Sequence, residues 1–221
     1  MKAHSVRSLR HSKSAFTLIE LLVVIAIMAL LASLTMMGFS SASINASRSR
    51  TAAFHRAIMS GLENYHSENG EYPEPRSAGK RTNFGTSQYE IGGALMLYQA
   101  LSGDGDDEIK SANSRRSPSD GAAETDAEIA NIMLKEMPRE MSQKTSTGEW
   151  LVMDGFGHPF QYTYPQRRGS GESAGQGAPS TNTINTTYDL WSYAEDDKHT
   201  NETSLTSKQE VNISGKWIKN W

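Results

Sequence analysis

The N-terminal region places one carboxylate inside a long apolar stretch. Glu20 lies between Phe16 and Leu34, and no further charged residue occurs from Leu21 to Ser47. An acidic side chain inside a membrane-spanning segment is unfavourable by about 2.5–3.5 kcal/mol on insertion scales, so we expect it to have a function. A cut before Phe16 would create a positive α-amino group at a similar depth. Pairing that amine with the Glu20 carboxylate of a neighbouring helix would relieve both charges.

A second interpretation of the same residues is local. Thr17 and Glu20 have the spacing of a helix capping box, in which the threonine is the N-cap and the glutamate reaches back to its backbone N–H. Capping and pairing between subunits do not exclude each other, because they can occur at different times. Both interpretations stay open at this point.

A basic leader precedes the apolar stretch. Residues 1–15 contain no acidic residue and four basic ones, namely Lys2, Arg7, Arg10 and Lys13. Positive charges stay on the cytoplasmic side, so the C-terminus is expected outside. Residues 16–39 are long enough for a membrane-spanning helix, which needs about 20 apolar residues. A secretory signal peptide fits less well, because its apolar region is normally only about 7–15 residues long. An ordinary signal anchor is the simpler alternative.

Composition excludes several function classes. The 221 residues have a formal net charge of −3, from 22 basic and 25 acidic residues. Without the leader, 18 basic residues remain against 25 acidic ones, which argues against nonspecific nucleic-acid binding. The chain has no cysteine, and therefore no disulfide, thiol chemistry or cysteine metal site. It also has no nucleophile elbow, phosphate-binding loop or zinc-protease motif, so we do not expect an enzyme.

Residues 14–34 resemble the N-terminal signature of the type IV pilin and type II secretion pseudopilin superfamily. The shared features are the basic leader, a small residue, and Phe-Thr-Leu-Ile-Glu at residues 16–20 opening an apolar helix. The resemblance implies cleavage between Ala15 and Phe16 by a prepilin peptidase, followed by N-methylation of Phe16. It also implies assembly through Phe16 and Glu20. Ala15 stands where relatives usually have glycine.

The helix is predicted to continue outside the membrane over residues 40–68, on the periplasmic side. Apolar residues recur there at i, i+3, i+4 spacing, and Asn69-Gly70 supplies a left-handed stop. The predicted buried face consists of Ala53, Phe54, Ala57, Ile58, Gly61, Leu62 and Tyr65, whereas His55 falls on the other face. An apolar helix that carries a head in this way is suited to polymerisation.

Residues 69–148 are predicted to form a variable helix and loop region of the head. Short helices are expected over residues 91–101 and 126–137. Irregular or loop segments are expected over residues 74–88, 104–108 and 111–122. The acidic run at 104–108 lacks the spacing of an EF-hand, so we interpret it as a solvated loop.

Residues 149–221 are predicted to form a small antiparallel β-sheet. Period-two alternation and turn residues place strands at 150–153, 160–164 and 187–193. The turn at 154–162 resembles a turn of the major pseudopilins, and 188–193 resembles the strand that follows it in them. The chain is thus most similar to the major pseudopilin of type II secretion systems. This implies an α+β, pilin-like fold: a long N-terminal α-helix, membrane-spanning in its first half, with a small antiparallel sheet in the head.

The same resemblance implies a structural Ca²⁺ site after the last of these strands. By position, its ligands would be Leu190, Ser192 and Asp196, through backbone or side-chain oxygens. Ca²⁺ takes six to eight oxygen ligands, including carboxylates, so the residue types are suitable.

The sequence departs from the family around that site. Ala194 and Asp197 replace two glycines, and Trp217 replaces an aspartate near the C-terminus. The alternative to calcium is therefore a strand, turn and strand closed by Trp217 and Trp221, which would pack on the sheet while the acids are merely solvated.

Taken together, these features predict a pseudopilin subunit held in the bacterial inner membrane, with its N-terminus cytoplasmic and its head periplasmic. Expected partners are prepilin peptidase, other copies joined through the N-terminal helices, the inner-membrane secretion platform and minor pseudopilins. Its role would be to drive protein export across the outer membrane. One alternative is a subunit of a type IV pilus or DNA-uptake pilus, whose heads usually contain a cysteine pair. The other is a membrane-anchored binding module that does not assemble.

Overall fold

The computed structural model describes residues 16–75, 79–103, 132–135, 137–165 and 182–221, apart from the side chains of residues 35–39. The chain divides into two compact units, Met1–Ser43 and Ile44–Trp221. The predicted loops at 104–108 and 111–122 lie outside the described residues, as does most of the helix predicted at 126–137. The described end of that helix, residues 132–135, is irregular.

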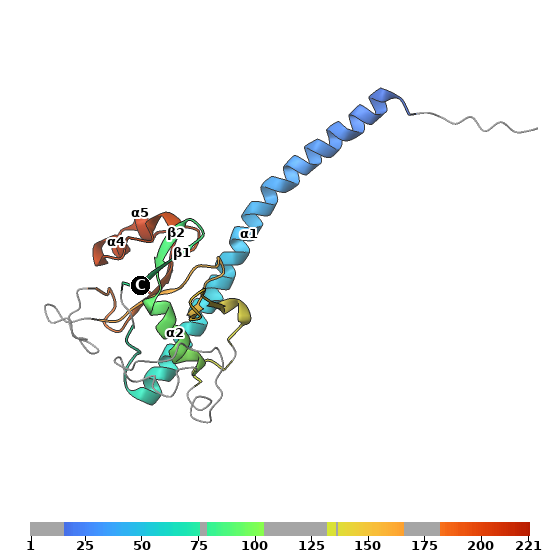
Figure 1. Cartoon of the computed structure of the whole chain (residues 1–221). Helices are drawn as coiled ribbons and strands as arrows, with labels where there is room; N and C mark the ends of the chain where they lie inside the picture. The colour runs from blue at the N-terminus through green and yellow to red at the C-terminus, as the bar shows by residue number, and fades with distance from the viewer. Residues whose placement is uncertain (1–15, 76–78, 104–131, 136, 166–181) are drawn as a thin grey trace, which may run out of the picture. The chain divides into compact units, whose positions relative to one another are not determined.

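One long helix, α1 (Leu18–Asn69), runs through both units (Figure 1). Sequence analysis predicted helix over residues 16–68. The helix ends at Gly70, which has a φ of +79° and whose N–H donates to the carbonyl oxygen of His66 at 2.8 Å. Glycine adopts this left-handed conformation without the steric cost that a side chain imposes, so the stop is encoded locally.

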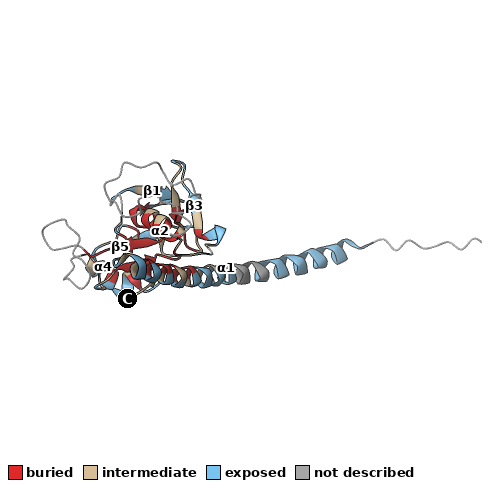
Figure 2. Ribbon diagram, turned by 90° about the horizontal axis from the view of Figure 1, so that it is seen from below, coloured by how far each residue is buried: buried red, intermediate tan, exposed pale blue. Residues whose placement is uncertain are grey.

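The described side chains of the first unit are exposed in the single chain (Figure 2). Phe16 is 82% exposed and Leu34 is 61% exposed, with apolar side chains of similar exposure between them. Among the residues that the structure describes, no helix has both the length and the apolar character to cross a bilayer. The predicted membrane segment at 16–39 is therefore not confirmed.

In the second unit, α1 packs through a face centred on Ile58, which is fully buried. The predicted face was wrong at two positions, because Ala53 is exposed and His55 is 5% exposed. At 3.6 residues per turn, Ala53 lies about 140° around the helix from Ile58 and His55 only about 60°. The imidazole is tolerated in the interior because it has a hydrogen-bond partner there.

A β-hairpin follows α1 where an irregular segment was predicted. Strands β1 (Arg81–Phe84) and β2 (Ser87–Glu90) pair antiparallel, with Arg81 opposite Glu90 and Phe84 opposite Ser87. The hairpin lacks the apolar alternation that signals a strand, since Tyr89 is its only buried residue.

Helix α2 (Gly92–Ser102) corresponds to the helix predicted at 91–101 and ends at the left-handed Gly103. It lies directly against strand β5. A Cβ atom at Gly93 would be 2.6 Å from the carbonyl oxygen of Tyr162, so only glycine permits this approach. Tyr98 and Leu101 are buried, whereas Leu95 is only partly buried.

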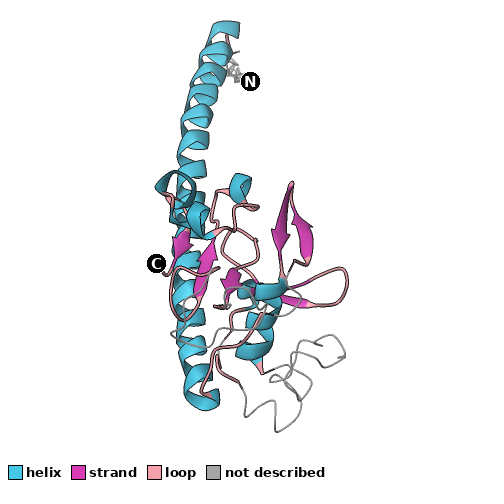
Figure 3. Cartoon of the chain, turned by 90° about the vertical axis from the view of Figure 1, so that its left-hand side faces the viewer, coloured by secondary structure: helices cyan, strands magenta, loops and turns pink. Residues whose placement is uncertain are grey.

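The rest of the head consists of short elements (Figure 3). A 3₁₀ turn, η1 (Arg139–Met141), precedes the antiparallel pair β3 (Ser142–Lys144) and β4 (Trp150–Val152). A three-stranded antiparallel sheet has the order β5 (Gln161–Thr163), β6 (Asp189–Ser192), β7 (Ile218–Lys219). Between β6 and β7 lie η2 (Asp197–His199), α4 (Leu205–Gln209) and α5 (Val211–Ser214). The fold is α+β and pilin-like, with an N-terminal helix followed by small antiparallel sheets.

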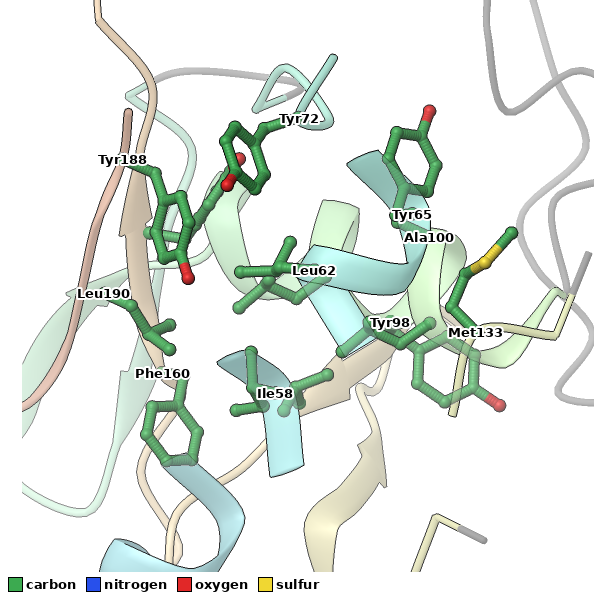
Figure 4. Close-up of a cluster of buried hydrophobic side chains, with 14 of the residues drawn as sticks. Ile58, Leu62, Tyr65, Tyr72, Tyr98, Ala100, Met133, Phe160, Tyr188 and Leu190 are labelled. Atoms are coloured by element: carbon green, nitrogen blue, oxygen red, sulfur yellow. The ribbon is translucent and has the colours of Figure 1, made fainter. Parts of the chain in front are cut away.

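The main core lies between α1 and the sheet. Ile58 and Leu62 of α1 face Phe160 and Leu190, and Tyr188 lies on the same side (Figure 4). Ile58, Leu62, Phe160 and Leu190 have no exposed surface. Each such side chain stabilises the fold by about 1.5–3 kcal/mol through apolar burial, so this cluster holds the second half of α1 to the head.

A second, aromatic cluster closes the C-terminal end of the sheet. Trp191 of β6 stacks on Trp217 with ring centroids 6.4 Å apart and meets Trp221 edge-on at 5.8 Å. Tyr89 and Tyr193 belong to the same cluster. Trp217 and Trp221 thus pack on the sheet, as the alternative to calcium predicted. That alternative was wrong about the acids being merely solvated, because the side chain of Asp196 is mostly buried.

Candidate functional site

The N-terminal site is a capping box at the start of α1. The backbone N–H of Thr17 donates to Oε2 of Glu20 at 2.9 Å, and the Thr17 hydroxyl donates to the same oxygen at 2.8 Å. In return, the Glu20 N–H donates to the Thr17 hydroxyl oxygen at 3.3 Å. These bonds satisfy donors that have no partner within the helix, as a capping box does. In the single chain, the Glu20 carboxylate is therefore engaged locally.

Phe16 lies just outside this box, before the first helical residue. Its ring and the apolar side chains on the following turns are exposed, and the capping box itself lies at the surface. Ala15, the other residue of the predicted cleavage site, lies outside the described residues. The site thus consists of a carboxylate on an apolar surface that none of the described residues covers.

The head contains a buried carboxylate that sequence analysis placed only in a turn. Asp154 is 2% exposed, and its Oδ1 accepts hydrogen bonds from the N–H groups of Phe156 at 2.8 Å and His158 at 2.9 Å. Its Oδ2 accepts from the hydroxyl of Ser192 at 2.5 Å. Burial raises the pKa of Asp154, although these hydrogen bonds act in the opposite direction. Asp154 therefore organises the turn and fixes it to strand β6.

The same turn also contacts α1. The N–H of Gly155 donates to the hydroxyl of Thr51 at 2.9 Å. A Cβ atom at Gly155 would be 2.5 Å from the carbonyl oxygen of Ser47, so a side chain would separate the turn from the helix. On the next turn of α1, His55 Nε2 lies 3.1 Å from the carbonyl oxygen of Leu190, which only accepts, so Nε2 carries the proton. Burial lowers the pKa of His55, against the effect of this bond.

The three predicted calcium ligands are engaged with protein donors. The carbonyl oxygen of Leu190 accepts from His55 and from the N–H of Asn220 at 3.2 Å. The Ser192 hydroxyl donates to Asp154 and accepts from the Ala194 N–H at 2.9 Å.

Asp196 is the third of these residues, and its Oδ2 accepts from the Trp217 indole N–H at 3.1 Å. In the part of the chain that the structure describes, no three His, Cys, Asp or Glu side chains are grouped so that they could hold a metal ion. The oxygens of Leu190, Ser192 and Asp196 are thus already hydrogen-bonded within the protein, and calcium binding at these residues stays a prediction.

Sequence analysis also missed a buried ion pair. Lys208 Nζ lies 3.0 Å from Asp189 Oδ2, and neither side chain has any exposed surface. Burial lowers the pKa of Lys208, whereas the Asp189 carboxylate raises it. Lys208 lies in a polar stretch with no apolar pattern, so nothing in the sequence marked it as an interior residue. A half-buried pair, Arg48 with Glu195 at 2.6 Å, links α1 to the segment after β6.

Comparison with known proteins identifies the N-terminal site. Residues 10–36 match the model of the prokaryotic N-terminal methylation motif. The chain carries a prepilin-type methylation motif. No match is found among curated proteins or among solved structures. The methylation motif supports membership of the pilin and pseudopilin superfamily and indicates a membrane-anchored, pilin-like substrate of prepilin peptidase that assembles into pilus-like polymers. Pseudopilins and pilus subunits share the motif, so it does not separate them.

Proposed function

We propose that this chain is a non-enzymatic structural subunit of a type II secretion-like pseudopilus. The observation that carries the proposal is the methylation motif at residues 10–36, with Glu20 as the charged residue of an exposed apolar helix. The total absence of cysteine favours a pseudopilin over a pilus subunit whose head is closed by a disulfide. Before assembly, the subunit would be held in the inner membrane with its head in the periplasm.

Maturation would change the partner of Glu20. Cleavage between Ala15 and Phe16, followed by methylation, would place a positive amine one residue before Thr17. In the single chain the Glu20 carboxylate accepts from Thr17. In the filament it would pair with the Phe16 amine of a neighbouring subunit, because two charges surrounded by apolar helices are each unfavourable alone. That pair would align each incoming subunit.

The other expected partners follow from this role. Prepilin peptidase would process the chain, and the inner-membrane secretion platform would move it from the bilayer into the filament together with minor pseudopilins. The apolar side chains between residues 16 and 34, which are exposed in the single chain, would exchange lipid for neighbouring helices. No nucleic acid is expected as a partner.

The first test is intact and N-terminal peptide mass spectrometry on protein from its native membrane. We expect a mature chain that begins at methylated Phe16. A chain that begins at Met1, or a cut near residue 40, would overturn the filament role and leave a membrane-anchored module.

Genetic deletion separates the two kinds of filament. Loss of the pseudopilus subunit is expected to retain exported proteins in the periplasm while surface pili and DNA uptake persist. The opposite pattern would identify a subunit of a type IV pilus or DNA-uptake pilus.

Glu20→Ala tests the assembly step itself. This variant is expected to insert and to be cleaved at Ala15–Phe16 like the unmodified chain, but to yield few filaments. Normal filament formation by Glu20→Ala would exclude the role of the carboxylate in alignment.

A further inference from the structure

The ammonium group of Lys208 occupies a site built for a cation. It lies 3.0 Å from Oδ2 of Asp189 and donates to the carbonyl oxygen of Asn182 at 2.7 Å. Nζ lies over the ring of Trp191, 4.8 Å from its centroid, and 6.0 Å from the ring centroid of Trp221. A carboxylate, a carbonyl and two indole faces are all groups that stabilise a positive charge.

The anionic partner, Asp189, also accepts hydrogen bonds from two backbone N–H groups. Asp189 Oδ2 also accepts from the N–H of Ile184 at 2.8 Å, and Oδ1 accepts from the N–H of Asn185 at 3.0 Å. The carboxylate therefore folds the segment just before β6 while facing Lys208. Because a buried carboxylate is strongly unfavourable without a cation, this segment depends on the ammonium.

The cation arrives from a different part of the chain. Lys208 lies on α4, where the Ser204 side chain caps the first turn by accepting from the Ser207 N–H. The carbonyl oxygen of Lys208 accepts from the Trp221 indole N–H at 3.3 Å. The site thus joins three segments: residues 182–189, α4 and the last residues of the chain.

The C-terminal residues complete the connection to β6. The side chain of Asn220 accepts from the N–H of Leu190 at 2.9 Å and donates to the carbonyl oxygen of Tyr188 at 3.1 Å. Lys208 and Asn220 together attach the C-terminal segment to the sheet from two sides. In a protein with a structural metal, the ion joins loops in this way.

We propose that Lys208 is a tethered internal cation that fastens the C-terminal segment to the sheet, so that the head folds without calcium. The oxygens of Leu190, Ser192 and Asp196 accept hydrogen bonds from protein donors, and the positive charge lies instead on a side chain facing Asp189. Stability of the head would then be independent of the calcium concentration around it. The inference does not depend on the filament role, because it concerns only contacts within the head.

The first experiment measures thermal unfolding of the full chain in detergent, with about 1 mM EDTA or with about 5 mM CaCl₂. Calcium that binds only the folded state would raise the melting temperature. We expect the two melting temperatures to agree within about 1 °C. A rise of several degrees in CaCl₂ would overturn the proposal and support calcium at the predicted ligands.

The second experiment removes the internal charge. Lys208→Met keeps the unbranched stem of the side chain, one atom shorter, but leaves the Asp189 carboxylate without its cation, so we expect the folding equilibrium constant to fall by roughly a hundredfold or more. Adding Asp189→Asn removes the orphaned charge and is expected to recover part of that loss, which a double-mutant cycle measures. Lys198→Met, at an exposed lysine, is the matched control.

Hydrogen exchange shows which part of the head Lys208→Met destabilises. In Lys208→Met the amides of β7 and of the last residues are expected to lose protection, while those of α1 at residues 44–69 keep it. A Lys208→Met protein as stable as Lys198→Met, or a double variant that shows no recovery, would overturn the proposal. If Lys208→Met does not fold at all, the melting temperatures of the unmodified chain in EDTA and in CaCl₂ still test the proposal.

Discussion

The Thr17 hydroxyl and backbone N–H both donate to the same oxygen of Glu20, at 2.8 and 2.9 Å. The residue that the family resemblance assigns to contacts between subunits is thus already a helix cap in the single chain. A new partner for Glu20 would have to share this oxygen, use the other one, or replace Thr17. The capping box and the proposed ion pair therefore use the same side chain, and they exclude each other only if the new partner replaces Thr17.

Thr17→Val tests this relationship, because it removes the hydroxyl and keeps the shape. Loss of a threonine cap destabilises a helix start by about 1 kcal/mol, so the first turn of α1 is expected to fray. Filament yield, measured by sedimentation, is expected to stay near that of the unmodified chain, since the Glu20 charge remains.

Glu20→Gln is the matched partner of that variant. Glutamine still accepts from the Thr17 N–H in a capping box, but it has no charge to pair with an amine. We expect an intact first turn and a strongly reduced filament yield. A low filament yield from Thr17→Val together with a normal yield from Glu20→Gln would show that capping, rather than charge, is what assembly requires.

Asp154→Ala is expected to destabilise the head by about 2–4 kcal/mol, because two backbone N–H groups and the Ser192 hydroxyl lose their acceptor. Asp154→Asn keeps an acceptor for the N–H groups and adds a donor for Ser192, so its loss is expected to be about 1 kcal/mol or less. Urea denaturation of the two variants measures the difference. Equal losses would mean that charge, and not hydrogen bonding, makes the residue necessary.

Ala194 is the one non-glycine residue with a positive φ, 54°, among those that the structure describes. Relief of that conformation favours Ala194→Gly by about 1–2 kcal/mol, and the loss of a buried methyl and greater chain entropy oppose it by a similar amount. We therefore expect Ala194→Gly to change the free energy of unfolding by no more than about 1 kcal/mol. Ala94→Gly, at a buried helical alanine of α2, has no strain to relieve and is expected to lose about 1–2 kcal/mol. Similar losses of stability in Ala194→Gly and Ala94→Gly would contradict the backbone strain that we assign to Ala194.

The tyrosines of the head predict sensitivity to alkali. Burial raises the pKa of six of them, Tyr72, Tyr89, Tyr162, Tyr164, Tyr188 and Tyr193. For Tyr72 the value is about 12. A folded-state pKa above the unfolded value contributes stability that is complete below about pH 10 and is lost as the pH rises through the folded value.

Absorbance at 295 nm, which reports tyrosinate, checks this expectation. Above about pH 10 the unfolded chain in urea should ionise normally, whereas the native head should show most of its tyrosinate signal only as it unfolds. Tyr72→Phe removes one such group, so its stability deficit relative to the unmodified chain should narrow between about pH 10 and pH 12. A native protein whose tyrosines all titrate near pH 10 would contradict the burial.

Contiguous sequence patterns were sufficient for the two ends of α1. The capping box needs only Thr17 and Glu20 three residues apart, and the end of α1 needs only Gly70. The methylation motif is likewise a single run at residues 10–36. Such features depend on residues close in the chain, so their geometry follows from helix periodicity and the conformational freedom of glycine. The packing of Trp217 and Trp221 was predictable because large aromatic side chains near a sheet rarely stay in solvent.

The head was decided by contacts between distant segments. Lys208 meets Asp189, 19 residues away, and Ser192 meets Asp154, 38 residues away. The burial of His55 depends on a carbonyl 135 residues further along the chain. Polar residues are stable in an interior only when a partner satisfies them, and a one-dimensional pattern does not show which partner the fold will bring. Calcium at Leu190, Ser192 and Asp196 was implied by the family resemblance alone. Only the tertiary structure decided that these oxygens accept from His55, Ala194 and Trp217, and that Lys208 lies beside Asp189.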